Sequence, residues 1–461
     1  MRTQTSCGEA ELDDACWRFG LLAALLALAL VLHQLWWDGF EVASLHFVVV
    51  LAAFAVLLRP TSVPRFLGLL AVEVVAVARD MPGASSHTVL IGVCGATVLA
   101  YAGWTALSTR RLPTAGELLE RIAPFLRMGL LVLYAAAALA KMNGGFFDAA
   151  VSCGAALAPR VAWFDPGLLD RAWLAPLAIY GTVLVEVALP VLLGVRRTRV
   201  AGLALGTAFH LVLALAGNVP FSSLVLALYV AFLPAGVVSR ARAVLLARGP
   251  AWLGVPARGL VRGAAFAALV GGWLAGAAGA EADPARAQEL IGSATRLVVV
   301  GVVLAAAVLA VAVRRTRAWP AAPSPRLGHP IFAVGIAVLV ANALTPYVGW
   351  KTESSFTMYS NLQTEADDWN HAFIPKAVRV FGQQDELVTV TASDDPLLLR
   401  RTSHGTRMVR FELERYLRGH PGVHATVAPG VAVDAGGPPL SALVDRVAKF
   451  RDVRATGRRG C

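Results

Sequence analysis

The sequence predicts an all-α bundle of membrane-spanning helices with a small α+β domain at its C-terminal end. Hydrophobic residues make up 57% of the chain and charged residues only 15%, and a mean hydropathy of +0.63 is too apolar for a soluble protein of 461 residues. About 20 consecutive apolar residues span a bilayer as a helix, and about eleven stretches approach this length. The chain turns polar after residue 347, where a separate domain is predicted to begin.

Apolar composition and turn-forming boundaries define the predicted spans, of which the second, third and seventh are short. They are residues 18–37, 43–58, 66–79, 88–108, 126–142, 172–194, 200–216, 219–238, 259–279, 293–313 and 329–347. The first stretch follows an acidic leader and carries Trp36 and Trp37 where a signal peptide would have a small-residue cleavage site. It is therefore expected to be a retained span. The predicted organisation is a leader at 1–17, a membrane body at 18–347 and a tail domain at 348–461.

The arginines predict the orientation of the chain. They gather in alternate loops: Arg59 and Arg65; Arg110, Arg111 and Arg121; Arg196, Arg197 and Arg199; Arg240, Arg242, Arg248 and Arg258; Arg314, Arg315, Arg317 and Arg326. The positive-inside rule then places the N-terminus in the cytoplasm and the tail outside. The net charge of +11 is therefore explained by the orientation of the chain in the membrane, and no nucleic-acid partner is predicted. Abundant Ala, Arg, Gly and Val with few lysines suggest a GC-rich bacterial genome, hence the cytoplasmic membrane of a bacterium.

Cysteine and histidine spacing predicts no metal site. None of the five cysteines forms a C-x-x-C pair, although the topology permits a Cys153–Cys461 disulfide. His420 and His424 have the spacing of helical metal ligands, but Pro421 and Gly422 lie between them and break a helix.

The tail predicts a mixed α+β domain. Residues 347–370 combine aromatic and polar side chains, as in a segment at the membrane interface. Beyond them, 386–391 and 423–427 alternate like strands, while 407–418 has helical spacing. Leu440, Leu443, Val444 and Val447 predict a closing amphipathic helix.

Ionisable residues inside apolar spans are candidates for chemistry, because placing them there is costly. Lys141, one of only four lysines, ends the fifth span. An ammonium partly removed from water can lose its proton and become a base. The alternative is a lysine that snorkels to the headgroups. His210 is expected roughly 10 Å below the outer surface, and the two groups could line one outward-facing cavity. A histidine satisfied within the core is the alternative for His210.

The other ionisable residues predicted inside spans are Glu73, Glu186 and, more marginally, His33 and His46. Glu186 is expected roughly 20 Å below the outer surface, too deep to pair with Lys141. Both glutamates are expected to bond to neighbouring helices.

Two motifs give the chain a resemblance to a known family. The string Tyr134-Ala-Ala-Ala-Ala-Leu-Ala-Lys141-Met-Asn-Gly-Gly-Phe146 resembles the lysine motif of the vitamin K-dependent gamma-carboxylases. Phe209-His210, followed by Asn218-Val-Pro-Phe-Ser-Ser and an apolar run to Pro234, is similar to their histidine helix. The segment from Pro346 to Glu365 also resembles bacterial members. Together these motifs resemble the HTTM domain, the membrane body of this group.

This resemblance implies an activity and site residues. In the carboxylases the lysine deprotonates a reduced quinone, whose reaction with O2 makes a strong base that removes a proton from a substrate glutamate, and CO2 then adds. The resemblance makes Lys141 the initiating base and His210 an oxyanion or proton-transfer partner. Ala140 stands where the animal enzymes tend to carry a second lysine, and this tail is much shorter than theirs. Family membership alone does not establish the reaction.

Three functions are therefore weighed. The first is a quinol-dependent carboxylase or oxidase acting on an extracytoplasmic peptide or small molecule, which requires Lys141 to face the bundle. The second is a non-enzymatic component for export, maturation of or immunity to a secreted peptide, favoured if Lys141 faces lipid. The third is a solute transporter, which needs a polar path that Glu73 and Glu186 could supply.

Overall fold

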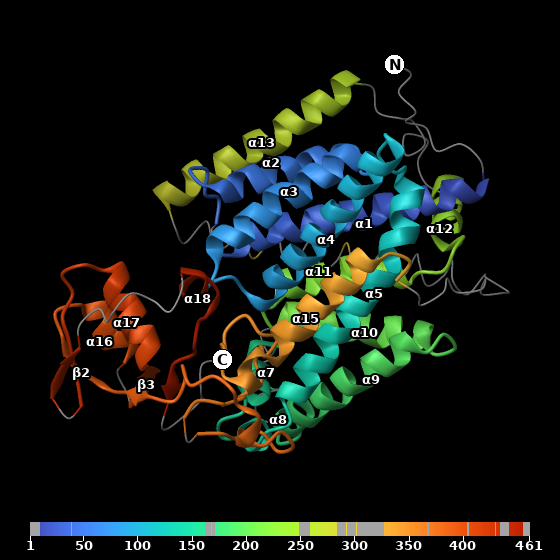
Figure 1. Cartoon of the computed structure of the whole chain (residues 1–461). Coiled ribbons are helices and arrows are strands. Elements are labelled where there is room, and N and C mark those ends of the chain that lie inside the picture. Colours follow the sequence, from blue (N-terminus) through green and yellow to red (C-terminus); the bar gives the residue numbers. More distant parts are fainter. Residues whose placement is uncertain are drawn as a thin grey trace. The chain divides into compact units, whose positions relative to one another are not determined.

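The computed structural model is mostly helical up to residue 348, and small sheets follow near the C-terminus (Figure 1). It describes residues 10–37, 39–161, 167, 171–248, 259–283, 292, 301, 327–366, 368–402, 405–428, 430–433 and 442–454. Apart from residue 301, the predicted span at 293–313 lies outside the described residues, as do residues 1–9 of the leader.

The helices before the tail follow the apolar stretches closely. They are α1 (Ala10–Trp37), α2 (Leu45–Leu58), α3 (Val63–Asp80), α4 (Ser86–Thr109), α5 (Ala115–Ala140), α6 (Gly144–Phe147), α7 (Cys153–Val161), α8 (Leu174–Pro176), the π-helix η2 (Leu177–Gly181), α9 (Thr182–Gly194), α10 (Arg199–Leu215), α11 (Val219–Tyr229), the 3-10 helix η3 (Val230–Phe232), α12 (Val237–Arg248), α13 (Gly259–Ala282) and α15 (Pro330–Val348).

Among the described residues, six helices are long and apolar enough to cross a membrane: 14–37, 86–109, 115–140, 174–194, 262–282 and 330–348. A seventh is possible if the pair 219–232 and 237–243 is one span, but the pair bends by 104°. The eleven predicted spans are therefore not confirmed. Hydropathy did not reveal the bend near Pro234, where proline cannot continue a helix, and α2 and α10 are only 14 and 17 residues long.

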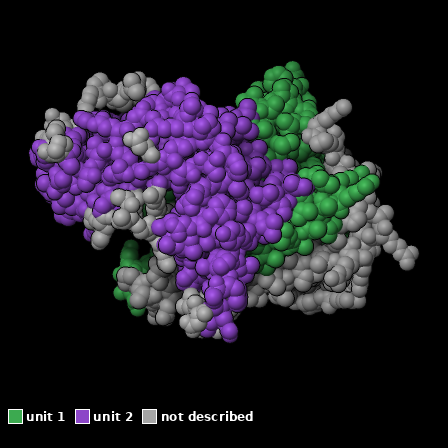
Figure 2. All heavy atoms as spheres, turned by 90° about the horizontal axis from the view of Figure 1, so that it is seen from below, with its two compact units in different colours: residues 1–78, 91–130, 192–336 green, residues 79–90, 131–191, 337–461 purple. Residues whose placement is uncertain are grey.

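The chain divides into two compact units (Figure 2). Unit 1 comprises residues 1–78, 91–130 and 192–336, and unit 2 comprises residues 79–90, 131–191 and 337–461. The predicted boundary at residue 347 stays a prediction.

Small residues allow close helix packing in unit 1. Gly202 of α10 lies against the α9 end, where an added Cβ would come within 3.0 Å of Leu192 Cβ and the Leu193 nitrogen. Gly335 of α15 is tighter, because a Cβ there would come within 2.6 Å of Thr97 Oγ1 and 2.7 Å of Phe125. In apolar bundles such residues let backbones approach and gain dispersion contacts.

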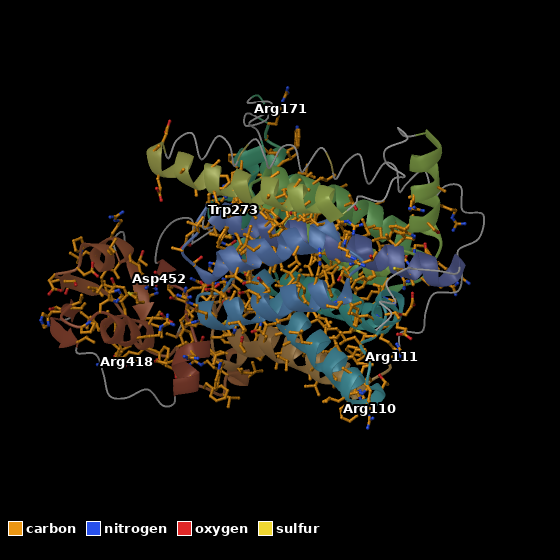
Figure 3. All side chains as sticks on the ribbon, turned by 90° about the horizontal axis from the view of Figure 1, so that it is seen from above. Arg110, Arg111, Arg171, Trp273, Arg418 and Asp452 are labelled. Carbon is orange, nitrogen blue, oxygen red and sulfur yellow. The ribbon has the colours of Figure 1, made fainter. Side chains whose placement is uncertain are left out.

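A separate aromatic cluster in unit 1 joins α13 to α2. Trp273 of α13 is buried with Leu35, Val50 and Phe54 (Figure 3). Its indole nitrogen donates a hydrogen bond to the Glu41 carbonyl at 3.3 Å, so the polar atom of this large side chain is satisfied.

Unit 2 ends in the predicted α+β fold. Two antiparallel three-stranded sheets form, in the orders β1-β3-β6 and β2-β4-β5. The strands are β1 (Leu387–Val388), β2 (Val390–Ser393), β3 (Thr406–Val409), β4 (Ala425–Val427), β5 (Val431–Val433) and β6 (Val453–Arg454), and the helices are η5 (Lys376–Val378), α16 (Pro396–Arg401), α17 (Arg410–Gly419) and α18 (Ala442–Val447).

The strand predictions at 386–391 and 423–427 and the closing helix are confirmed. The helix predicted at 407–418 is wrong at its start, because residues 407–409 belong to β3. There Met408 and Val409 are both buried, on opposite faces of the strand, in two different clusters. Apolar side chains buried on both faces do not alternate, so sequence periodicity could not distinguish this strand from a helical turn.

Adjacent leucines of α16 offer a matched test of the tail core. Leu398 is fully buried and Leu397 is 63% exposed. We expect Leu398→Ala to destabilise the tail by about 2–5 kcal/mol, because it leaves a cavity, and Leu397→Ala to change it by at most about 0.5 kcal/mol. Hydrogen–deuterium exchange of β2 and β4 amides in the full-length protein measures both. Equal effects would contradict this account of the core.

Candidate functional site

Lys141 follows the last residue of α5, where the sequence Asn143-Gly-Gly ends one helix and starts the next. The Asn143 side chain accepts a hydrogen bond from Phe146 N at 2.9 Å, which caps α6. Its amide donates to the Ala140 carbonyl at 2.8 Å, which satisfies an orphan acceptor at the end of α5. One buried side chain thus fixes both helix ends around Lys141.

Lys141 faces protein and forms a buried ion pair. Its Nζ lies 2.8 Å from Glu186 Oε2 of α9, and the two side chains are 4% and 11% exposed. Nζ also lies 3.4 Å from the Met358 carbonyl and 5.8 Å from the centre of the Phe146 ring. The prediction that Glu186 lies too deep to pair with Lys141 is wrong.

The error has a physical cause, namely that the end of α5 is not at the surface. Residues 351–374, hereafter the roof segment, pack over it. Asn143 donates to the Ser360 carbonyl at 2.6 Å, and Ala372 N donates to the Met142 carbonyl at 2.9 Å. The sequence places Lys141 at the end of an apolar helix, whereas in the fold a segment more than two hundred residues away covers it.

The roof segment is polar yet buried. Ser355, Phe356 and Thr364 are fully buried. Several side chains of the segment bond to its own backbone, such as Ser360 to the Thr357 carbonyl. Its location at the membrane interface stays a prediction. A run of Ser, Thr and Asn without helical or strand periodicity was the available sequence signal for such a packed loop.

The roof segment also contains backbone conformations that side chains rarely adopt. Ser354, Phe356, Tyr359 and Asn361 have φ values between 48° and 61°. Each such residue costs about 1 kcal/mol or more and persists only where the surroundings hold it. Asn361 is held on both sides, because its amide donates to the Val151 carbonyl and its Oδ1 accepts from Cys153 N.

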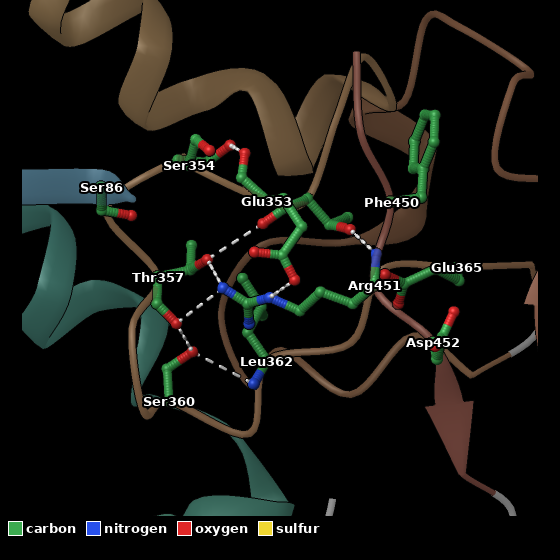
Figure 4. Close-up of polar contacts among 12 residues, drawn as sticks. Ser86, Glu353, Ser354, Thr357, Ser360, Leu362, Glu365, Phe450, Arg451 and Asp452 are labelled. Carbon is green, nitrogen blue, oxygen red and sulfur yellow. Dashed lines mark hydrogen bonds and ion pairs between the residues drawn. The ribbon is translucent and has the colours of Figure 1, made fainter. Parts of the chain in front are cut away.

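Residues 449–452, hereafter the C-terminal arm, also bond to the roof segment (Figure 4). The Lys449 carbonyl accepts from both Thr352 N and Glu353 N. The Arg451 guanidinium donates hydrogen bonds to the Thr357 carbonyl at 3.1 Å and to the Thr357 hydroxyl. Its Nε lies 3.4 Å from Glu353 Oε1. Sequence reasoning missed this contact because it joins positions almost a hundred residues apart.

Two more ionisable groups of the roof segment are buried. Burial lowers the pKa of Lys351 to about 8, although nearby Glu353 opposes the shift. Burial raises the pKa of the Glu365 carboxyl, while Thr364 N and Arg451 oppose the rise. Neither residue was predicted as part of a site.

His210 lies in unit 1, whereas Lys141 lies in unit 2. It is fully buried in α10, and its ring makes edge contacts with Phe209, Phe221 and Tyr229 at centroid distances of 5.4, 5.2 and 6.1 Å. The expectation that both residues line one cavity stays a prediction.

A small apolar cluster adjoins Lys141. Ala140, Tyr347 and Leu362 are buried together, and the Tyr347 hydroxyl has no hydrogen-bond partner among the described residues. An apolar wall with one unpartnered hydroxyl is the kind of surface that contacts an apolar ring carrying oxygens. A reduced quinone as the ligand stays a prediction of the resemblance.

The described residues contain no group of three or more metal-ligating side chains. Cys153 and Cys16 are disulfide-bonded and Cys94 is a buried free thiol. The predicted partner of Cys153, residue 461, lies outside the described residues. A disulfide at Cys16 is unusual for the cytoplasmic side, where the arginine pattern places this residue.

No family model, curated protein or solved structure matches this chain.

The buried ion pair predicts non-additive stability effects. Lys141→Met or Glu186→Leu alone should each destabilise the protein by about 3–5 kcal/mol, because each leaves an uncompensated buried charge. The double variant should lose much less than the sum. Thermal unfolding of the detergent-purified protein tests this double-mutant cycle. Additive losses would mean that the two groups do not interact.

Because of His371, we expect the stability of the roof segment to depend on pH. Its Nδ1 accepts from Phe373 N and Ile374 N, and its Nε2–H donates to the Leu139 carbonyl. Burial lowers the pKa of His371 below 6.5, and the bond to Leu139 partly offsets this. The folded state thus binds the proton of His371 more weakly than the unfolded chain does. The contribution of neutral His371 to the stability of the fold is therefore full above pH 6.5 and declines as the pH falls below it.

Hydrogen–deuterium exchange of residues 371–374 measures this effect, and protection should fall between pH 7 and pH 5 after correction for intrinsic exchange rates. His420→Gln, which changes an exposed histidine, should leave the decline intact, whereas His371→Gln should remove it. A decline that persists in His371→Gln would assign it to another group.

Proposed function

We propose that this protein is an integral-membrane enzyme of the gamma-carboxylase-like HTTM group, with Lys141 and Glu186 as its proton-transfer pair. The observation that carries the proposal is the buried ion pair at 2.8 Å at the end of an apolar helix. A carboxylase-like role requires Lys141 to face the protein. Its burial against Glu186, Met358 and Phe146 meets that requirement. A lysine facing lipid would have favoured a non-enzymatic, peptide-handling role instead.

The pair changes the expected role of Lys141. A protonated amine has no lone pair, so Lys141 acts as a base only after it gives up a proton. Glu186 Oε2 lies 2.8 Å from Nζ and takes that proton once the two groups align as a hydrogen bond, because the contact described here is an ion pair without hydrogen-bond geometry. The resulting neutral amine would then accept a proton from a hydroxyl of the bound reduced quinone, to which the Tyr347 phenol would donate a hydrogen bond.

The cofactor implied by the resemblance is a reduced quinone, which would supply, with O2 and CO2, the strong base and the added carboxyl group. In this proposal Ala140, Tyr347 and Leu362 bind its ring, and Lys141 positions its oxygen. The substrate is an extracytoplasmic peptide or small molecule. The role of His210 and the outward orientation of the tail stay predictions.

The two alternatives are less well supported. A transporter would use Glu186 as a free carboxylate along a polar path, whereas here that carboxylate is engaged by Lys141. A non-enzymatic peptide-handling component does not require a buried ion pair.

Membranes containing the protein should fix labelled CO2 into an acidic peptide when supplied with a reduced menaquinone and oxygen. Lys141→Arg keeps a cation beside Glu186 but cannot supply a neutral amine, so we expect at least a hundredfold lower rate, in line with the loss of a general base, about 10²–10⁴-fold. Lys376→Arg, at an exposed lysine, is the matched control and should retain full activity. Equal activity of Lys141→Arg and wild type would contradict the proposed base, and no fixation by any variant would contradict the reaction.

A further inference from the structure

A buried arginine in unit 1 has no acidic partner in the part of the chain that the structure describes. Arg127 lies in the apolar helix α5 and is only 7% exposed. Its Nε donates to the Ala123 carbonyl at 3.1 Å, while one of its terminal NH2 groups has no hydrogen-bond partner among the described residues. A guanidinium in an apolar span is costly unless it is paired or binds something.

The nearby carboxylates are already engaged by another arginine. Arg18 of α1, also buried, donates from Nε to Asp14 Oδ2 at 2.9 Å and is ion-paired with Glu120 through its NH2 group. Asp14 accepts in addition from Ser239 N at 3.1 Å. Glu120 and Arg18 both act electrostatically on Arg127, but no ion pair between Arg127 and a described carboxylate forms.

A second arginine adds to the positive charge. Arg199, the first residue of α10, acts electrostatically on Arg127. Its Nε donates to the Leu193 carbonyl at 3.1 Å, and its guanidinium lies 5.9 Å from the centre of the Phe232 ring. Among the described residues it has no acidic partner. The two carboxylates of Asp14 and Glu120 both pair with Arg18. Arg127 and Arg199 are thus left without an acidic partner among the described residues.

The backbone at this point also favours an anion. Helix α10 has 17 residues, and the Thr198 side chain at its N-cap does not bond to its free N–H groups, because it donates instead to the Leu192 carbonyl. The positive end of the helix dipole therefore adds to the two unpaired guanidinium groups.

We infer that Arg127 and Arg199 bind the phosphate of an anionic membrane phospholipid. Guanidinium groups bind phosphate through paired N–H donors, and basic pockets between spans on the cytoplasmic side are typical of such lipids. The arginine-rich loop at 196–199 is predicted to be cytoplasmic. Val195 and Val200, which flank Arg199, are 49% and 36% exposed and offer an apolar surface to an acyl chain.

Binding of dioleoyl phosphatidylglycerol to the purified full-length protein tests this site, with native mass spectrometry as the readout. Arg127→Gln and Arg199→Gln should each raise the Kd about tenfold, the effect of losing about 1.4 kcal/mol. Arg197→Gln removes an exposed arginine of the same loop and should change the Kd less than twofold. If Arg127→Gln does not fold, Arg199→Gln alone decides.

Two further ligands distinguish the source of the phosphate. Phosphatidylcholine and inorganic phosphate should bind at least tenfold more weakly than phosphatidylglycerol. Equal binding of inorganic phosphate would overturn the assignment to a lipid, and equal binding of all variants would overturn the site itself. Because Lys141 and Glu186 are unchanged in every variant, the result does not depend on the proposed enzymatic activity.

Discussion

The buried pair of Lys141 and Glu186 is the interaction on which the candidate site depends. A lysine at the end of an apolar helix would ordinarily reach toward the headgroups. Here the roof segment closes over the end of α5, and the ammonium finds a carboxylate at 2.8 Å inside the protein. Desolvating both charges is costly, so the pair persists only with good geometry and supporting polar contacts. The Met358 carbonyl and the Asn143 network provide that support.

The roof segment links the pair to the tail domain. Its strained residues are held by Asn361 on the helix side and by Arg451 and Lys449 on the tail side. The C-terminal arm and Lys141 therefore both contact the roof segment, Lys141 through the Met358 carbonyl. The small α+β domain has its own core, which contains Leu398 and Met408.

Unit 1 concentrates its charges elsewhere. Arg18 pairs with both Asp14 and Glu120, which leaves Arg127 with an unpartnered terminal NH2 group. Arg199 likewise has no acidic partner among the described residues. The two sites follow the same rule, that a charge inside an apolar bundle needs a partner. In unit 2 the protein supplies the partner for Lys141, whereas in unit 1 we assign the partner of Arg127 to the surrounding membrane.

Composition and hydropathy alone determined that this chain forms apolar helices followed by a small α+β tail, because burial of apolar surface depends on residue type and period. They also singled out Lys141 as a rare ammonium at a helix end. They could not determine the bend after Phe232, strand β3, or the partner of Lys141. Those depend on which distant segments pack together: Glu186, the roof segment and Arg451 meet Lys141 or one another across tens to hundreds of residues, and no local pattern in the sequence specifies such contacts. Only the tertiary structure decided them.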